Sequence, residues 1–356
     1  YFQEFVFPVL TPIAFDPGRP FPHISNLSLN LAVLIRDSAG KERFARIKVP
    51  GTLPRLVPVK TSGGNRRQHH FVWLGQLIIA HLEMLFPGME IVEAHPFRVT
   101  RNADMVIQEL EADDLLATME EGVRQRRFGT VVRMAVNRDM SQRVREILTT
   151  NLRLNSEDIY TLEDPLGFSD LSALYRIDRY ELKFPAFLPA THKANNNQAG
   201  EVDLFAAIRQ QDILLHHPYD SFSPVVEFLN AAARDPNVLA IKQTLYRVGS
   251  NSPIVEALLK ARENDKQVSV LVELKARFDE ESNIEWARKL ETAGVHVIYG
   301  LLGLKTHSKI ALVVRQEGKR IRRYVHMATG NYNTVTAHLY TDLGYFTCNE
   351  DVGADA

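Results

Sequence analysis

The chain has 356 residues, of which 45% are hydrophobic and 24% are charged, so it is long enough for two domains with separate cores. Its formal net charge of -1 excludes a strong global attraction to polyanions and leaves any such affinity to local basic clusters. A single cysteine, Cys348, excludes an internal disulfide framework and favours a reducing compartment, the cytoplasm. No apolar run in the sequence reaches the length of a membrane span.

The first half of the chain mixes strand and helix patterns. Residues 28–36 and 43–49 have strand-like composition, and residues 109–127 have helical periodicity with many charges. A linker is expected over residues 184–200, where two prolines and three consecutive asparagines occur without periodicity.

We therefore predict two domains: a mixed α+β domain over residues 1–195 and an α/β domain over residues 196–356. The chain begins without a methionine and with residues suited to packing. We expect it to be a piece of a longer protein.

The second half repeats a strand–helix unit. Strand-like runs at residues 238–246, 267–273 and 295–299 are separated by two amphipathic segments, the first of which opens with Ser252 as N-cap and Pro253 behind it. This βαβαβ order predicts a mixed, largely parallel sheet flanked by helices, with ligands at the carboxyl ends of its strands.

Basic side chains follow the expected strands. Arg247 comes after the first strand and Arg277 after the second, and both guanidinium groups offer the planar pair of donors that suits phosphate. The turn after the third strand leads into Lys305, His307 and Lys309.

The alternation of these last three residues suggests a shared face. If the segment from Lys305 onward is extended, His307 lies between two ammonium groups that keep its imidazole neutral and nucleophilic near pH 7. A phosphoryl group, with oxygens for the lysines to hold, is the natural electrophile. Alternatively, His307 is a half-buried histidine in a surface strand, and the two lysines face solvent. The sequence has no Walker motif that would indicate ATP binding.

Many long segments, in order along the whole chain, resemble the polyphosphate kinases of the bacterial, long-chain-synthesising type. They include HPFRVTRNAD, DILLHHPYDSF, AIKQTLYRV, VLVELKARFDEESNI, AGVHVIYG, GLKTHSKIALVVR and TGNYN. The resemblance implies an ATP:polyphosphate phosphotransferase that moves the γ-phosphate of ATP reversibly onto inorganic polyphosphate through a phosphohistidine, with Mg²⁺ as cofactor.

The resemblance also assigns residues. His307 matches the phosphorylated histidine, Arg247 and Arg277 match positions associated with Mg²⁺ and bound phosphates, and Tyr340 matches a nucleotide contact. Because a guanidinium is a poor metal ligand, we expect the two arginines to bind the oxygens of the Mg-phosphate. Asp342, two residues after Tyr340, is predicted to orient a histidine from a domain outside this chain.

The implied partners are ATP, ADP and inorganic polyphosphate, with no nucleic acid, in a homo-oligomer. The chain resembles the head domain and first catalytic domain of that family. A small N-terminal domain and a second catalytic domain of the same protein are expected outside it. The implied location is cytoplasmic, with peripheral membrane association left open.

The family's catalytic domains resemble the phospholipase D fold, in which two H-x-K motifs face each other across one site. His307 and Lys309 supply one motif, and the sequence contains no second. Two other functions stay open: a polyanion-binding module without turnover, and a phospholipase D-like diesterase or nuclease. Val314 counts against the diesterase, because diesterases of the phospholipase D superfamily usually have aspartate five residues after the lysine of the H-x-K motif.

Overall fold

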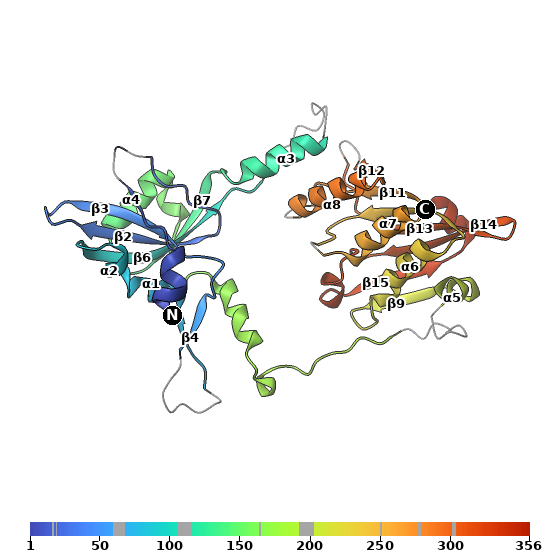
Figure 1. Cartoon of the computed structure of the whole chain (residues 1–356), viewed down its shortest axis with the longest axis horizontal. Coiled ribbons are helices and arrows are strands. Elements are labelled where there is room, and N and C mark those ends of the chain that lie inside the picture. Colours follow the sequence, from blue (N-terminus) through green and yellow to red (C-terminus); the bar gives the residue numbers. More distant parts are fainter. Residues whose placement is uncertain are drawn as a thin grey trace. The chain divides into compact units, whose positions relative to one another are not determined.

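The computed structural model describes residues 1–15, 18, 20–59, 68–104, 115–163, 165–191, 203–249, 251–276, 279–300 and 304–356. The chain forms two compact units (Figure 1). Unit 1 comprises Tyr1–Asp104 and Gln125–Phe184, and unit 2 comprises Met105–Arg124 and Pro185–Ala356. The domain boundary predicted near residue 195 lies outside the described residues.

Unit 1 is built on a six-stranded sheet with the strand order β1-β3-β2-β6-β7-β8. Neighbouring strands are antiparallel except β7 and β8, which are parallel. The strands are β1 (Ile13–Phe15), β2 (Leu29–Arg36), β3 (Glu42–Lys48), β6 (Glu90–Arg101), β7 (Val131–Asn137) and β8 (Ile159–Leu162). A separate antiparallel pair joins β4 (Leu56–Val59) to β5 (His70–Trp73).

Both faces of this sheet are covered, which explains the uninterrupted apolar run of β2. Leu31 and Val33 alternate with Ala32 and Leu34, and the two pairs belong to different core clusters because successive side chains of a strand point to opposite faces. One face packs against η1 (Phe2–Val6), α1 (Leu74–Ile79) and α2 (Leu82–Leu85), and the other against α4 (Gln142–Leu152).

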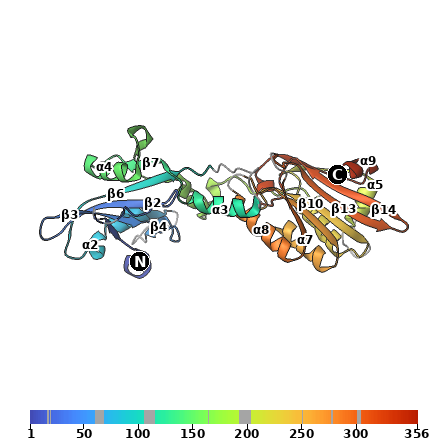
Figure 2. The same ribbon diagram turned by 90° about the horizontal axis from the view of Figure 1, so that it is seen from above.

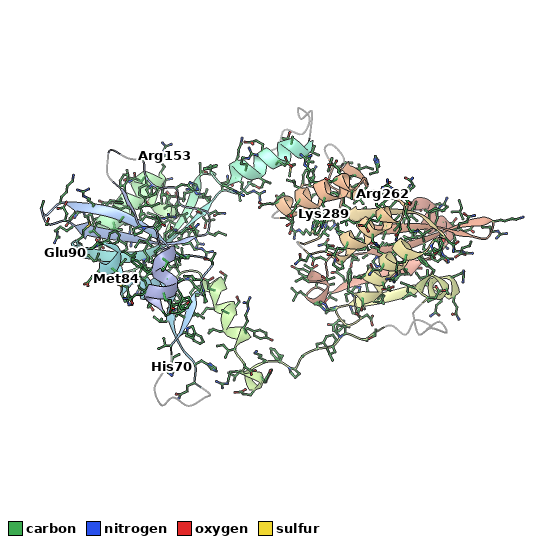
Figure 3. The ribbon with its side chains drawn as sticks, in the orientation of Figure 1. His70, Met84, Glu90, Arg153, Arg262 and Lys289 are labelled. Atoms are coloured by element: carbon green, nitrogen blue, oxygen red, sulfur yellow. The ribbon has the colours of Figure 1, made fainter. Side chains whose placement is uncertain are left out.

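Helix α4 has clear end signals in the sequence. The Ser141 hydroxyl caps its first turn by accepting a hydrogen bond from the Val144 backbone N–H at 3.2 Å. Arg153, labelled beside α4 in Figure 3, follows the helix. Its backbone is left-handed, with φ 56°. Further helical turns in the described part of unit 1 are η2 (Phe7–Val9), η4 (Ser156–Asp158), η5 (Phe168–Arg176) and η6 (Tyr180–Leu182).

Unit 2 contains a seven-stranded sheet with the order β12-β11-β10-β13-β14-β15-β9. The strands are β9 (Ile213–His217), β10 (Val238–Leu245), β11 (Gln267–Val272), β12 (His296–Tyr299), β13 (Lys309–Glu317), β14 (Arg320–Ala328) and β15 (Asp342–Thr347). The predicted βαβαβ unit is present as the parallel strands β10, β11 and β12. The mixed α/β class is confirmed.

The expectation of a largely parallel sheet is wrong. Strand β13 pairs antiparallel with β10, and the pairings β13–β14, β14–β15 and β15–β9 are antiparallel as well. The physical reason lies in the connections: a tight turn at Gly318 joins β13 to β14, and a turn that short can only join antiparallel strands.

The helices of unit 2 are α5 (Leu204–Gln210), α6 (Ser223–Arg234), α7 (Pro253–Glu263), α8 (Glu280–Thr292) and α9 (Glu350–Asp355), with the short turn η7 (Thr336–His338). Helices α7 and α8 lie on one face of the sheet (Figure 2). Ser252 caps α7 as predicted, its hydroxyl accepting from the Val255 N–H. Gly294, with φ 79°, follows the end of α8.

Helix α3 (Leu115–Arg126) lies early in the chain, yet its described first ten residues belong to unit 2. Leu116 and Met119 are buried in the unit 2 core cluster, and Glu120 pairs with the Arg288 guanidinium on α8 at 3.1 Å. Among the described residues, no helix is both long and apolar enough to cross a membrane.

Candidate functional site

The carboxyl ends of the parallel strands in unit 2 meet the segment that leads into β13. Tyr246 and Arg247 directly follow β10, Glu273 directly follows β11, and residues 304–308 precede β13 without regular secondary structure. The sheet therefore brings side chains from distant parts of the sequence to one edge.

The Tyr246 ring gathers the basic side chains at this edge. The ring of His307 meets it edge-on, with 5.0 Å between ring centroids and 75° between ring planes. The Lys309 Nζ lies 5.0 Å from the Tyr246 centroid, and the Lys305 Nζ and the Arg247 Cζ each lie 5.7 Å from it. We call these five residues the His307 cluster. The negative faces of an aromatic ring attract cations, so Tyr246 favours their gathering here.

The His307 imidazole is exposed, and its neighbours disfavour the positive charge of its protonated form. The positive charge of Lys309 lowers its pKa below the usual 6.5, with partial burial and the charges of Lys305 and Arg247 acting in the same direction. An imidazole that stays neutral keeps a nitrogen lone pair available. An accessible nucleophile thus lies among groups that attract anions.

Lys309 is the buried cation of the cluster, only 4% exposed. Its ammonium group donates a hydrogen bond to the His307 carbonyl oxygen at 2.5 Å, which fixes the lysine beside the histidine backbone. Burial lowers the pKa of Lys309, the charge of Asp342 raises it, and that of Arg247 lowers it further. Asp342 is thus the acidic neighbour of this lysine.

Thr244, on β10, fixes the backbone on both sides of Lys309. Its hydroxyl donates to the Ser308 carbonyl oxygen and accepts from the Ile310 N–H, each at 2.9 Å. The two bonds position the H-x-K motif against the end of β10.

Glu273 holds the segment ahead of His307. Its fully buried carboxylate accepts from the Thr306 N–H at 2.6 Å and from the Lys275 N–H at 2.9 Å. The Lys275 ammonium group donates to the Leu304 carbonyl oxygen at 2.6 Å. The end of β11 thereby restrains the backbone of residues 304–306 before it reaches His307.

Arg247 occupies a constrained position after β10. Its backbone is left-handed, with φ 54°, and its carbonyl oxygen accepts from the Asn333 amide at 2.9 Å. Its guanidinium pairs with the Asp279 carboxylate at 3.4 Å. Asn333 in turn accepts from the Val335 and Thr336 N–H groups, so the TGNYN turn is tied to the end of β10.

The predicted site residues thus fall into three groups. The structure brings His307, Lys305, Lys309 and Arg247 together at Tyr246. Arg277 lies outside the described residues.

Tyr340 and Asp342 lie on the same connection, after the TGNYN turn. The Tyr340 side chain is 61% exposed, and within the described part of the chain it makes no ring or hydrogen-bond contact with the cluster. Asp342 accepts from the Thr329 hydroxyl at 2.8 Å, and its carboxylate leaves no room for a side chain at Gly330. The orienting role predicted for Asp342 stays a prediction.

The predicted reason for the cluster was wrong in one respect. Strand β13 begins at Lys309, so Lys305 and His307 do not share a strand face with it. The three side chains meet at the Tyr246 ring, although residues 304–308 belong to no strand. Sequence reasoning did not single out Tyr246, Thr244 or Glu273; the only signal was their position at expected strand ends.

The described residues do not fit a metal site built by protein ligands. Among them no group of three or more histidine, cysteine, aspartate or glutamate side chains is placed to hold a metal ion. The side chains around His307 are cations, and a guanidinium or ammonium group has no lone pair to offer Mg²⁺. Assigning Arg247 as a metal ligand is therefore unsupported by its chemistry.

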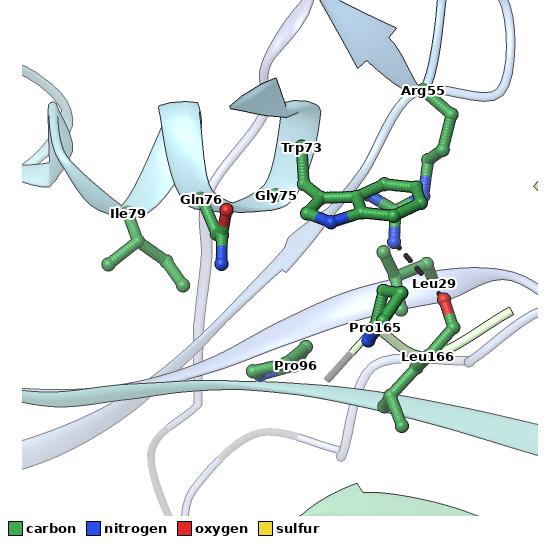
Figure 4. Close-up of a pocket in the computed structure, with 9 residues that line it drawn as sticks. All are labelled: Leu29, Arg55, Trp73, Gly75, Gln76, Ile79, Pro96, Pro165 and Leu166. Atoms are coloured by element: carbon green, nitrogen blue, oxygen red, sulfur yellow. Dashed lines mark hydrogen bonds between the residues drawn. The ribbon is translucent and has the colours of Figure 1, made fainter. Parts of the chain in front are cut away.

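A small pocket lies in unit 1, not at the His307 cluster (Figure 4). The Arg55 guanidinium lies 5.4 Å from the Trp73 ring centroid, on its face, and donates to the Leu166 carbonyl oxygen at 3.2 Å. Gln76 and Pro96 line the same pocket. Its lining is largely apolar and offers no nucleophile.

Fold and site together define a two-unit α/β protein with an exposed, neutral histidine set in a cluster of cations. Two family models match the chain: the polyphosphate kinase middle domain over residues 1–174 and the polyphosphate kinase C-terminal domain 1 over residues 203–356. The chain belongs to the polyphosphate kinase family.

Individual relatives agree. The chain is 54% identical over 359 aligned residues to a polyphosphate kinase of Prosthecochloris aestuarii, covering 100% of this chain and 50% of that protein. It resembles the crystal structure of polyphosphate kinase from Porphyromonas gingivalis with a TM-score of 0.77 and 28% identity, over 99% of this chain and 51% of that one. The chain spans about half the length of the curated relatives it matches.

A weaker likeness covers 41% of this chain and 88% of the phospholipase D family member Nuc from Salmonella typhimurium, with a TM-score of 0.33 and 14% identity.

Proposed function

We propose that this chain is the phosphohistidine-bearing part of a polyphosphate kinase, which transfers the γ-phosphoryl group of ATP reversibly to inorganic polyphosphate. One observation carries the proposal: the exposed His307 ring lies with three cations around Tyr246, and these cations both disfavour protonation of the ring and would hold a phosphate. Membership of the polyphosphate kinase family supports it.

In the forward reaction a ring nitrogen of His307 attacks the γ-phosphorus of ATP. A P–N bond forms as the bond from the γ-phosphorus to the β,γ-bridging oxygen breaks, and ADP leaves with that electron pair. A terminal oxygen of polyphosphate then attacks the same phosphorus. The P–N bond breaks, its electron pair returns to the imidazole, and the polymer is longer by one phosphoryl group.

The cations of the His307 cluster stabilise the charge that spreads over the non-bridging oxygens in both steps. Lys309 suits this role because it is buried, and Arg247 suits it because the Asn333 amide holds its backbone carbonyl. Neither cation needs much reorganisation to contact a phosphate. Arg277 and Tyr340 are proposed to contact phosphate and nucleotide. Any Mg²⁺ enters as part of the Mg-ATP substrate, on the phosphate oxygens.

The complete protein extends this site. Because the relatives are about twice as long as this chain, we propose that other domains of the same polypeptide complete the nucleotide and polyphosphate sites. Asp342 is proposed to orient a histidine from one of them. We also expect a homo-oligomer in the cytoplasm.

The test is transfer of label from γ-labelled ATP to the full-length protein. His307→Ala should abolish the acid-labile, base-stable label, because His307 supplies the one imidazole among the five residues of the His307 cluster. His296→Ala, an exposed histidine on β12, is the matched control and should keep the label. Undiminished label in His307→Ala would reject the proposal.

A further inference from the structure

A second group of cations lies in unit 1, on the sheet face that packs against α4. Arg46 and Lys48 stand two residues apart on β3, Arg101 ends β6, and His23 lies in the loop before β2. We call these four residues the Arg46 cluster. The proposed phosphoryl transfer makes no use of them.

Arg46 is the buried member. It is only 6% exposed, and its Nε donates to the side-chain oxygen of Asn30 at 2.7 Å. The Asn30 amide is itself held by the Ser28 carbonyl and hydroxyl oxygens, each at 3.0 Å. A guanidinium is costly to bury unless an anion accompanies it.

Arg101 is braced by the backbone. It donates to the Ile24 carbonyl oxygen and to the Gly129 carbonyl oxygen, each at 2.7 Å, and its remaining terminal nitrogen lies 3.4 Å from the His23 Nδ1. Because a guanidinium can only donate, the His23 Nδ1 accepts this contact, and the imidazole is neutral.

The charges of the Arg46 cluster converge on His23. Burial lowers the pKa of His23, and the positive charges of Arg101, Arg46 and Lys48 lower it further, whereas a hydrogen bond that the ring donates to the Arg127 backbone raises it. Lys48 reaches over this region and donates to the Ser25 hydroxyl at 3.3 Å.

No carboxylate balances this charge within the part of the chain that the structure describes. Burial alone shifts the pKa of Arg46 and of Arg101, in both cases downward, whereas an adjacent carboxylate would raise them. Other arginines of unit 1 do have acidic partners: Arg36 pairs with Glu42 and Glu90, and Arg55 pairs with Asp170.

We propose that the Arg46 cluster is a phosphate-binding site in unit 1, separate from the His307 cluster. Two guanidinium groups and an ammonium group gather there with no described carboxylate beside them, and such charged donors suit a tetrahedral oxyanion. The site takes a single phosphoryl group. Inorganic phosphate and the terminal or internal phosphoryl groups of polyphosphate share that chemistry, and only the second source rests on the proposed function.

The test uses the imidazole of His23 as a local reporter in the full-length protein. Its NMR signals are assigned by their loss in His23→Gln. Adding inorganic phosphate should shift them and raise the pKa of His23, because a bound dianion offsets the three positive charges that now oppose protonation. Binding should also weaken as ionic strength rises.

The double variant Arg46→Met, Lys48→Met should weaken phosphate binding by about a hundredfold, or about tenfold for each charge-assisted hydrogen bond lost. Lys48→Met alone should weaken it about tenfold, and because Lys48 is exposed this variant folds even if the double variant does not. Arg36→Met is the control: it removes an arginine of the same unit that already has acidic partners, and should leave binding unchanged.

Polyphosphate is then compared with inorganic phosphate. Much tighter binding of the polymer at equal phosphoryl concentration assigns the site to polyphosphate, and equal binding assigns it to phosphate; either supports the site. Unmoved His23 signals, or equal shifts in Lys48→Met and the parent, overturn it. Signals that depend on protein concentration without phosphate overturn it in favour of an acidic partner surface.

The double variant should keep phosphohistidine labelling at His307, because the Arg46 cluster takes no part in the proposed phosphoryl transfer. A normal His23 response with no label on His307 would reject the proposed function and leave the phosphate site standing.

Discussion

At the scale of single residues, the reactivity of His307 depends on charges that its neighbours hold close to it. Like charges repel, yet three cations surround one imidazole because the Tyr246 ring and the His307 carbonyl oxygen each offset part of that repulsion. The same charges that disfavour protonation of the ring are available to a phosphate. Basicity and phosphate binding are thus linked at this histidine.

Lys309→Met should raise the pKa of His307, because the charge of Lys309 is the largest cause of its lowering. More of the imidazole is then protonated near neutral pH, so the labelling rate in the variant should recover only at higher pH than in the parent. We expect the rate at neutral pH to fall about a hundredfold, since an oxyanion-stabilising donor is lost as well.

Two measurements check this: the NMR titration of His307 and the pH profile of phosphoenzyme formation. Lys260→Met, which removes an exposed lysine of α7 paired with Glu263, is the matched control and should change neither. An unchanged pKa of His307 in Lys309→Met would contradict the electrostatic account.

The residues of this cluster could be predicted only in part. The spacing of Lys305, His307 and Lys309 indicated a shared site, but only Lys309 belongs to strand β13. The role of Tyr246 could not be predicted, because a tyrosine at a strand end is commonly a surface aromatic. Its importance follows from three-dimensional convergence, which a single sequence does not encode.

At the scale of elements, β10 is the strand that connects the core of unit 2 to the site. It pairs in parallel with β11 and antiparallel with β13, and Thr244 near its end bonds to the backbone on both sides of Lys309. Hydrophobic periodicity predicted the elements from β10 to β12 well. It could not predict strand direction beyond them, because the side chains of parallel and antiparallel strands alternate alike.

Thr244→Val keeps the volume of the side chain and removes the hydrogen bonds of its hydroxyl. The Ile310 N–H then lacks its partner, so unit 2 should lose about 1–3 kcal/mol of unfolding free energy. Phosphoenzyme formation should fall as well, because the motif is no longer fixed against β10. Denaturant unfolding and labelling measure the two effects.

Thr292→Val serves as the control, since that hydroxyl donates to the Arg288 carbonyl oxygen within its own helix α8. If Thr244→Val is no worse than this control in both assays, the hydroxyl does not position the motif.

At the scale of the whole molecule, residues that are neighbours in the sequence do not all belong to the same hydrophobic core. The middle-domain family model covers residues 1–174, yet α3 within that range contributes Leu116 and Met119 to the core of unit 2. Helical periodicity identifies the buried face of α3, but it does not say which core that face joins. The prediction of two consecutive domains therefore did not include the packing of α3 in the core of unit 2.

Leu116→Ala should destabilise unit 2 by about 2–5 kcal/mol, the usual cost of a cavity at a buried leucine. The chain has two tryptophans, Trp73 in unit 1 and Trp286 in unit 2, so their separate fluorescence reports each unit. The denaturation midpoint reported by Trp286, in a Trp73→Phe background, should fall. That of Trp73, in a Trp286→Phe background, should not.

Leu148→Ala on α4 is the mirror control, because Leu148 is buried in a core cluster of unit 1. It should lower the Trp73 midpoint and spare that of Trp286. If Leu116→Ala lowered the Trp73 midpoint alone, α3 would stabilise unit 1 and would not belong to the core of unit 2.

The path of the chain also governs how the protein responds to being cut. The polypeptide passes from unit 1 into unit 2 at residues 104–105, returns at 124–125 and leaves again at 184–185. Proteolysis after residue 184 produces one fragment that still contains Leu116 and Met119 and another that contains the core into which they fit. We therefore expect the two halves to stay associated after the covalent link is broken. We also expect that pieces cut at boundaries drawn from sequence alone cannot be exchanged independently between proteins.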